Sequence, residues 1–555
     1  MRAKIGLLAG LLLVACQPAT DQSDANGSSP AAPPAVVPAT VFTGGTIYTG
    51  NGLETVDTVV VGSDDRIMFV EPPRSRDWVP DDVTIIDLDG AFMYPGFVDG
   101  HAHLLGIGQR ELQLNLEGTD SVAALVARVA VEAAGKAPGE LVFGRGWIET
   151  GWPEGRMPTA QDLDAVAPDN PVILVRADGH ALVANSAAMA AAWPDGAPAD
   201  PEGGRIERGE DGAPTGIIID NAMADVMALR SAPSEPDLIE AYIKAGDVYA
   251  ARGWTGVHNM SVSPDDALLL EKLDRDGDMP LRLVNYFDER GMELAASRRF
   301  ETDTIRNRGV KLYMDGALGS RGALLLAPYS DRPDTSGVSL MEPDRLQALM
   351  QEAASKGVQL AIHAIGDLAN RRILDQYELV GLGAGSRWCI EHTQILDPQD
   401  IARVGALGLI ASMQPSHAIG DLKFAPDRLG LDRLDGAYAW ASLLGSGAVI
   451  VGGSDAPVEY GSPLIEFYAA VARKDLAGAS GEGWHPEQAL TREQALALFT
   501  SAPAFAAFME DDLGTIEVGK LADFTVFDRD LMTIPEDEIL NAEVVMTVVQ
   551  GEIIL

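Results

Sequence analysis

Short apolar runs alternate with segments of helical periodicity through the middle of this 555-residue chain. Such runs, bounded by Gly, Asn or Asp, are typical of buried strands. Eight of them, mostly followed by a helical stretch, lie at residues 97–103, 255–260, 281–287, 310–315, 358–363, 388–392, 409–414 and 448–455. Eight strand–helix units make a (β/α)8 TIM barrel, so the sequence predicts an α/β fold with the barrel over residues 93–505.

Both ends of the chain carry strand patterns without intervening helices. They lie at residues 46–48, 58–61, 66–70 and 84–87, and at 522–527 and 544–549. We expect residues 41–92 and 506–555 to pair into one small sheet domain. Two independent edge hairpins are the alternative, but they would leave apolar strands exposed.

The gap between the first and second barrel strands is too long for a plain loop. Residues 104–254 contain their own strand patterns, among them 140–144 and 172–176. Because structureless loops of that length are uncommon in compact domains, we expect a subdomain inserted at about residues 135–225.

The N-terminus resembles an export signal. Arg2 and Lys4 precede an apolar run from Ile5 to Val14, which is too short to span a bilayer. Leu-Val-Ala-Cys at residues 13–16 resembles the lipobox of bacterial lipoproteins. This resemblance implies a signal peptide over 1–15, lipidation of Cys16, a flexible tether over 16–40 and a periplasmic, membrane-anchored enzyme. An ordinary signal peptide with an incidental cysteine is the alternative, and it also leads to export.

Composition narrows the class of partner. With 41 basic and 82 acidic residues the net charge is −41, which disfavours a nucleic-acid partner. Cys389 is the one other cysteine, so a lipidated Cys16 leaves no intramolecular disulfide.

The strongest chemical signal is a His-x-His pair at the end of the first barrel strand. Side chains alternate along a strand, so His101 and His103 point to the same side. Two imidazoles placed in this way can bind one metal ion at about 2.0–2.1 Å per bond. Taken alone, the pair is equally compatible with a chance arrangement on a surface strand.

Four more ionisable residues lie in or directly after later apolar runs, namely Lys311, His363, His392 and Asp455. Charged and imidazole side chains are rarely buried without a partner. The carboxyl ends of barrel strands share one face, so we expect these four residues to join His101 and His103 in a site for zinc or a similar metal.

Longer motifs around these residues resemble the amidohydrolase superfamily of metal-dependent hydrolases, in its YtcJ-like or amidohydrolase-3 branch. The resemblance covers nearly the whole mature chain and implies a barrel with a composite β-sandwich. The motifs are Gly-Phe-Val-Asp-Gly-His-Ala-His at 96–103, Gly-Trp-Ile-Glu at 146–149, Arg-Ala-Asp-Gly-His at 176–180, Lys-Leu-Tyr-Met-Asp-Gly at 311–316, Ile-His-Ala-Ile-Gly-Asp at 362–367, Glu-His-Thr-Gln at 391–394 and Gly-Ser-Asp-Ala-Pro at 453–457.

The resemblance implies two Zn²⁺ ions bridged by a carboxylated Lys311. His101 and His103 would bind the more buried ion, and His363 and His392 the second. Burial can lower a lysine pKa from about 10.4 to about 5–6, and the neutral amine can then add CO₂. An unmodified Lys311 paired with Asp315 is the alternative.

Asp455 is expected to contact the metals and to act as general base and acid. A positioned carboxylate typically contributes about 10²–10⁴-fold to rate, which is less than metal activation of a water supplies. As an alternative, Asp455 caps the next helix.

Several further residues are candidates for contacts with the substrate. By resemblance, His180 would donate to the scissile carbonyl or another polar group of the substrate. His417 would lie at the mouth of the seventh strand, and His258 would support the site; a structural role is equally compatible with both. Arg321 would orient a substrate carboxylate or pair within the protein, and Trp147 would contact an apolar group or simply pack in the core.

The predicted activity is hydrolysis of a non-peptide C–N bond, in an amide, N-formyl amine or cyclic amide, by a metal-bound hydroxide. Hydrolysis of an ester, lactone or carbamate would use the same residues. A non-catalytic periplasmic binding lipoprotein is the alternative from another class. The expected partner is a small molecule, with the membrane contacted only through the lipid anchor, and a homodimer is left open.

Overall fold

The computed structural model describes residues 36–71, 83–149, 151–177, 179, 181–201, 204–477, 480–481 and 483–555. The expected signal peptide, Cys16 and His180 lie outside these residues. Within the described part of the chain, no helix is both long and apolar enough to cross a bilayer.

Eight strands form one sheet in the order β19-β18-β17-β16-β15-β14-β13-β6, and every neighbouring pair is parallel. This arrangement confirms the predicted TIM barrel. The strands are β6 (Phe97–Ala102), β13 (Trp254–Val262), β14 (Arg282–Phe287), β15 (Ile305–Tyr313), β16 (Gln359–Ala364), β17 (Cys389–His392), β18 (Ile410–Met413) and β19 (Val449–Gly452).

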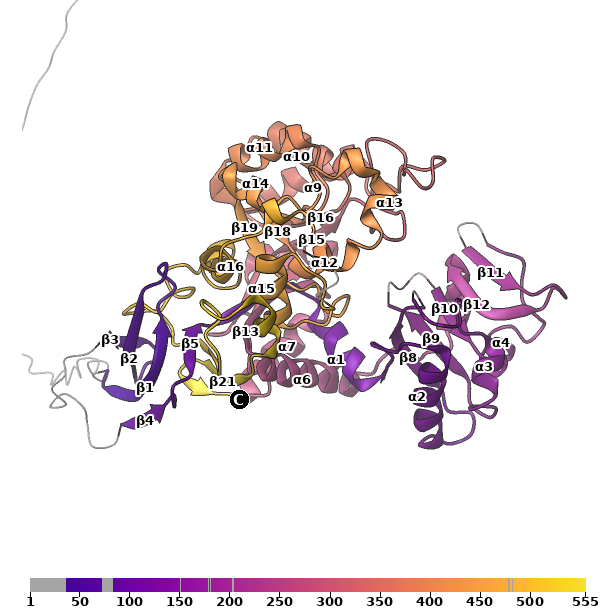
Figure 1. The fold of residues 1–555 in the computed structure, drawn as a ribbon, viewed down its shortest axis with the longest axis horizontal. Helices are drawn as coiled ribbons and strands as arrows, with labels where there is room; N and C mark the ends of the chain where they lie inside the picture. The colour runs from indigo at the N-terminus through magenta and orange to yellow at the C-terminus, as the bar shows by residue number, and fades with distance from the viewer. Residues whose placement is uncertain are drawn as a thin grey trace, which may run out of the picture. The chain divides into compact units, whose positions relative to one another are not determined.

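Amphipathic helices follow the barrel strands (Figure 1). In α9 (Pro343–Lys356) the buried residues Leu346, Leu349, Met350 and Ala353 recur at helical spacing, and Gly357 ends the helix with φ +66°. The main helices after β13 to β19 are α7 (Asp266–Asp276), α8 (Met292–Ser297), α9, α10 (Asp367–Val380), α11 (Pro398–Leu407), α12 (Pro415–Asp421), α13 (Ala425–Leu429), α14 (Trp440–Gly445), α15 (Pro463–Ala472), α16 (Arg492–Phe499) and α17 (Ser501–Ala506).

The loop after the last strand of the barrel is joined to the first strand by side chains as well as by backbone. Gly100 has no room for a side chain, because a Cβ would lie 2.2 Å from a methyl group of Val451. The buried Asp99 carboxylate accepts hydrogen bonds from the Ser454 backbone N–H (2.9 Å), the Ser454 hydroxyl (2.6 Å) and Tyr249 (3.0 Å). Burial raises the pKa of Asp99 to about 6. These contacts fix the loop after β19 against β6.

A second sheet combines both ends of the chain in the order β22-β21-β20-β5-β1-β2-β3, with β4 paired to β1. The apolar faces of these strands pack around Phe42, Val59, Met93 and Phe524. The strands are β1 (Pro38–Tyr48), β2 (Thr55–Gly62), β3 (Ile67–Val70), β4 (Thr84–Asp87), β5 (Phe92–Pro95), β20 (Phe524–Phe527), β21 (Val544–Val549) and β22 (Glu552–Ile553). The sandwich and its boundaries stay predictions.

A third sheet lies between β6 and β13 in the chain, in the order β11-β12-β10-β9-β8-β7. The sheet begins at Leu114, whereas the sequence placed the boundary of the subdomain near residue 135. Strand β7 has two residues and is too short to show a periodicity, so the sequence pattern did not include it. Its strands are β7 (Leu114–Asn115), β8 (Val142–Trp147), β9 (Val172–Arg176), β10 (Ala181–Ala184), β11 (Gly204–Arg208) and β12 (Pro214–Asp220). Helices α1 (Leu104–Leu112), α2 (Val122–Ala134), α3 (Ala160–Asp164), α4 (Ser186–Ala192), α5 (Ala224–Met227) and α6 (Glu235–Ala251) also lie between β6 and β13.

Candidate metal centre and active site

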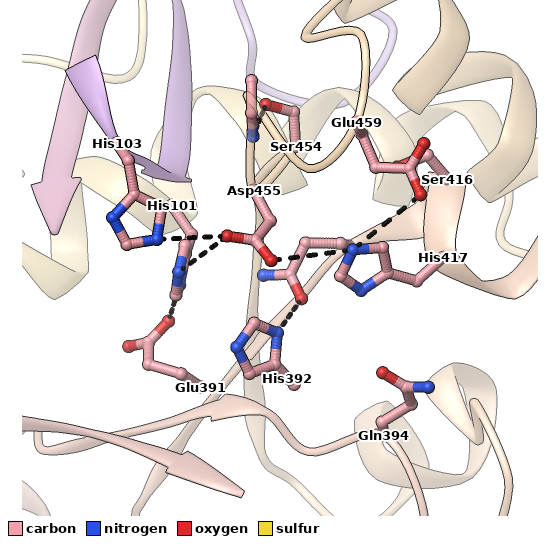
Figure 2. Close-up of polar contacts among 12 residues, drawn as sticks. His101, His103, Glu391, His392, Gln394, Ser416, His417, Ser454, Asp455 and Glu459 are labelled. Atoms are coloured by element: carbon pink, nitrogen blue, oxygen red, sulfur yellow. Dashed lines mark hydrogen bonds and ion pairs between the residues drawn. The ribbon is translucent and has the colours of Figure 1, made fainter. Parts of the chain in front are cut away.

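His101 is fully buried at the end of β6, and its ring is oriented by a carboxylate. Its Nδ1 bonds to Glu391, which is also fully buried (Figure 2). Its Nε2 lies 3.3 Å from Asp455 Oδ1 and 3.3 Å from Lys311 Nζ. A histidine that donates one ring N–H to a carboxylate keeps the lone pair of the other nitrogen free for a metal. His101 therefore has the orientation of a ligand.

His103 approaches the same carboxylate oxygen from the side open to solvent. Its Nε2 lies 3.3 Å from Asp455 Oδ1, and its side chain is 29% exposed. Burial lowers the pKa of His103, so the neutral form is favoured. The His-x-His pair thus converges on one oxygen, as the alternation of side chains along a strand predicts.

Asp455 lies in the loop after β19, with φ +58°. Its backbone N–H donates to the carbonyl of His101 at 2.7 Å, which holds the carboxylate beside the histidines. Burial acts to raise the pKa of Asp455, but hydrogen bonding and the charge of His101 outweigh burial and hold the pKa well below its usual range. The group is therefore ionised at neutral pH.

Lys311 is buried on β15, with 2% of its surface exposed. Of the described residues, none offers a carboxylate within ion-pair distance of its Nζ. Asp315, the alternative partner, instead accepts the backbone N–H groups of Leu324, Ile365 and Gly366 at 2.8–3.0 Å. The amine thus lies beside the His101 imidazole rather than paired with an acid, and its carboxylation stays a prediction.

His363 and His392 come from neighbouring strands, with ring centroids 4.5 Å apart. His392 Nδ1 donates to the Gln414 side-chain oxygen at 2.7 Å, which leaves Nε2 free. His363 Nε2 lies 3.4 Å from Asp315 Oδ1, but it is buried and makes no hydrogen bond with a described residue. Burial, followed by the charge of His363, holds the pKa of His392 well below its usual range, so it is a neutral imidazole.

The donor set fits a divalent metal. Ligand atoms of His101, His392 and Asp455 all lie within 4.8 Å of one another. Two ligands bonded tetrahedrally to zinc at about 2.0–2.1 Å are about 3.3 Å apart. The 3.3 Å separations of Asp455 Oδ1 from His101 and His103 match this value. Imidazole and carboxylate are ligands that zinc and similar ions prefer.

His417 lies in α12 beside the proposed ligands (Figure 2). Its Nε2 lies 3.7 Å from Asp455 Oδ2 and 3.9 Å from Glu459 Oε1. Burial lowers the pKa of His417, whereas burial and then the charge of Asp421 raise the pKa of Glu459 to about 8. His417 is thus near the second oxygen of Asp455, as its predicted position at the barrel mouth requires.

The other predicted residues lie away from this cluster or have partners of their own. Arg321 donates to both oxygens of Asp331, at 3.1 and 2.8 Å, so its charge is paired within the protein. Trp147 is fully buried in the core of the inserted sheet and donates to the Leu174 carbonyl at 3.0 Å. This is the core-packing alternative for Trp147, and it leaves no surface for a substrate. His258 is buried on β13.

Two residues that orient the histidines received no role from the sequence. Glu391 directly precedes His392 on a strand whose side chains alternate, so no periodicity links it to His101, 290 positions earlier. Gln414 follows an apolar run as a neutral amide and carries no signal of its own. The one available clue is that Glu391 is an acid in an otherwise apolar run, a position that favours a buried partner.

The parallel barrel, with histidines, a lysine and an aspartate at its carboxyl ends, is the architecture of a metal-dependent hydrolase. Comparison with known proteins is consistent with this class. The chain belongs to the amidohydrolase family, whose model matches residues 84–555. It is a hydrolase of that family, as the resemblance in its motifs predicts.

Individual relatives cover nearly the whole chain. "Putative amidohydrolase YtcJ" of Bacillus subtilis (strain 168) is 34% identical over 480 residues, covering 84% of this chain and 90% of the relative. An N-substituted formamide deformylase of Arthrobacter pascens is 30% identical, covering 85% and 89%. A solved metal-dependent hydrolase of Pyrococcus horikoshii OT3 is 29% identical, with a TM-score of 0.74, covering 90% and 99%.

Proposed function

We propose that the protein hydrolyses a non-peptide C–N bond in a small amide, N-formyl amine or cyclic amide. The observation that carries the proposal is the position of Asp455. One carboxylate oxygen lies 3.3 Å from both His101 and His103, and the other faces His417. A carboxylate beside a metal centre can accept a proton from water and then deliver it to the departing nitrogen. The name of the formamide deformylase relative supports C–N cleavage.

His101, His103, His363, His392 and Lys311 would hold two zinc ions or similar divalent ions, with Lys311 as the bridging carbamate. When bound, such ions lower the pKa of a water and polarise a carbonyl. Glu391 and Gln414 orient His101 and His392, so that the other ring nitrogen of each would be left to bind an ion. Asp455 moves the proton, and His417, together with the predicted His180, orients the substrate.

Paired substrates test this proposal against ester hydrolysis. N-benzylformamide and benzyl formate share an acyl group and differ in an amine or alcohol leaving group. We expect turnover of the formamide by the wild-type holoenzyme and its loss in Asp455→Asn. Turnover of the ester alone would favour the ester alternative. Bound metal without turnover across a broad panel of amides and esters would favour a binding protein.

We also propose export to the periplasm with a lipid on Cys16. Support comes from the basic residues and short apolar run before Leu-Val-Ala-Cys at 13–16. Mass spectrometry of the mature N-terminus is expected to show an acylated cysteine, and Cys16→Ser to release the protein from membranes. A mature chain that still begins at Met1 would contradict this proposal.

A further inference from the structure

A cavity of about 800 Å³ lies at the end of the barrel opposite to the histidines. It is lined by residues at the beginnings of three strands whose far ends carry Lys311, His363 and His392. Arg308 lies early in β15, Gln359 is the first residue of β16, and Trp388 directly precedes β17. Because the strands are parallel, this cavity is separate from the catalytic centre.

Two arginines, Arg298 and Arg308, line the cavity. Neither Arg298 nor Arg308 has a side-chain hydrogen bond or ion pair with another described residue. Arg308 Nε is buried and unpartnered, and the guanidinium lies 5.9 Å from the ring of Phe508. Burial, followed by the charge of Arg298, lowers the pKa of Arg308, although the charge of Glu301 acts to raise it. An unpartnered buried donor is costly, so an anion here would stabilise the protein.

Unpaired arginines are notable in a chain with 82 acidic and 41 basic residues. The neighbouring Arg387 is paired with Glu510 at 2.6 Å. Arg306, two positions before Arg308 on the same strand, donates to the backbone carbonyl of Ile305 at 3.1 Å. Arg387 and Arg306 are thus engaged within the protein, whereas Arg298 and Arg308 are not engaged with any described residue in this way.

The other polar groups of the lining are already engaged. Gln359 accepts from Tyr286 at 2.9 Å and donates to the Ala506 carbonyl at 3.0 Å. The Ser386 hydroxyl bonds to a tyrosine hydroxyl at 2.7 Å, and Trp388 donates to a backbone carbonyl at 3.1 Å. The free groups are two guanidiniums and an apolar wall that includes Phe508, which is 42% exposed.

We propose that this cavity binds a small organic oxyanion, in which a phosphate or carboxylate carries an apolar group. The two guanidiniums would bind the oxyanion, for which their planar donors are well suited. The apolar group would lie against Phe508. The cavity volume is within the range of small-molecule sites. A polyanion is disfavoured, because the net charge of −41 repels it.

Isothermal titration calorimetry of the full-length holoenzyme tests the proposal with phenyl phosphate and phenylacetate as probes. Benzyl alcohol is the uncharged control and is expected not to bind. We expect saturable binding of at least one anion, and the stronger of the two identifies phosphate or carboxylate as the preferred group. Arg308→Gln and Arg298→Gln are each expected to weaken that binding at least about tenfold.

Arg306→Gln is the matched control variant, because Arg306 is on the same strand and does not line the cavity. It is expected to bind the anion as the wild type does. Asp455→Asn is also expected to retain binding, which separates this site from the proposed catalysis. Unchanged thermal unfolding of each variant excludes a general loss of folding.

Three outcomes would overturn the proposal. The first is no saturable binding of either anion up to about 10 mM. The second is equal affinity in the wild type and both cavity variants. The third is arginine-dependent adsorption to vesicles of anionic phospholipid without binding of either soluble anion, which would assign the two charges to a membrane surface instead.

Discussion

Replacement of Glu391 by Gln tests how a buried carboxylate prepares His101 for a metal. Gln keeps the size of the side chain and removes its charge. Burial acts to raise the pKa of Glu391, but the charge of His101 outweighs burial and lowers it, so the wild-type group is a carboxylate. Both side chains are fully buried, so water does not screen the interaction. We therefore expect the variant to lose much of the orienting interaction and of the basicity that it gives His101.

The expected magnitude follows from similar contacts. Loss of a carboxylate that orients a ligating histidine typically weakens metal binding by about 10–100-fold, or about 1.4–2.8 kcal/mol. Competition with a chelator, followed by metal analysis, measures this change. Glu487→Gln is the matched control, because Glu487 also bonds to a histidine, His485, at 2.9 Å but is 61% exposed. Metal affinity of Glu391→Gln within about threefold of both the wild type and this control would refute the orienting role.

Three other predictions concern proton transfer by Asp455, the buried ion pair of Arg282 and Asp523, and the pH dependence of stability that His258 produces. Asp455→Asn is expected to lower kcat by about 10²–10⁴-fold in steady-state assays, whereas Lys311→Ala mainly lowers metal content; full activity of Asp455→Asn would exclude proton transfer by this residue. Asp523→Ala is expected to lower the free energy of unfolding in urea by about 3–5 kcal/mol, because it leaves the buried Arg282 without its partner; a loss below about 1 kcal/mol would contradict this. Burial lowers the pKa of His258 from 6.5 to about 4, so the folded state favours the neutral ring. The contribution of the neutral His258 ring to the free energy of unfolding is present above pH 6.5 and is lost as the pH falls toward 4. The free energy of unfolding is expected to fall by about 3 kcal/mol over this range. Urea unfolding of His258→Phe, measured at both ends of this pH range, is expected to show a smaller fall in the free energy of unfolding than the wild type. A fall as large as that of the wild type would refute the role of His258 in the pH dependence.

Hydrophobic patterning was sufficient for the barrel. Parallel strands are covered on both faces, so each one is a nearly continuous apolar run that stands out from the amphipathic helices around it. The same reasoning placed His101 and His103 together, because it needed only the alternation of side chains. The short strand β7 gave no such signal, so the sequence pattern placed the start of the inserted subdomain after the start of the sheet.

Contacts made across the barrel could not be predicted in this way. His101 contacts Glu391 because strands that are distant in the chain close into a ring. The spacing of the two residues in the sequence does not indicate that they are close in space. For Trp147 the sequence suggested a contact with substrate that the structure does not show. An aromatic residue near a motif is equally compatible with a place in the core and with a place in a pocket. The side-chain roles of the metal centre thus depended on family resemblance, whereas its position in the fold did not.

The sheet shared by the two ends of the chain has a consequence for synthesis. Strand β5 leads directly into β6, yet its partner β20 is made near the end of synthesis, and the contact between Phe97 and Thr525 joins residues 428 positions apart. At typical translation rates of about 5–20 residues per second, the ribosome needs about 20–90 s to supply that partner. Throughout this interval β1 can pair with one edge of β5, but the edge that pairs with β20 has no strand beside it. A nascent chain that stops before Phe524 would keep this edge permanently open, so premature termination is expected to produce aggregates rather than a smaller working enzyme.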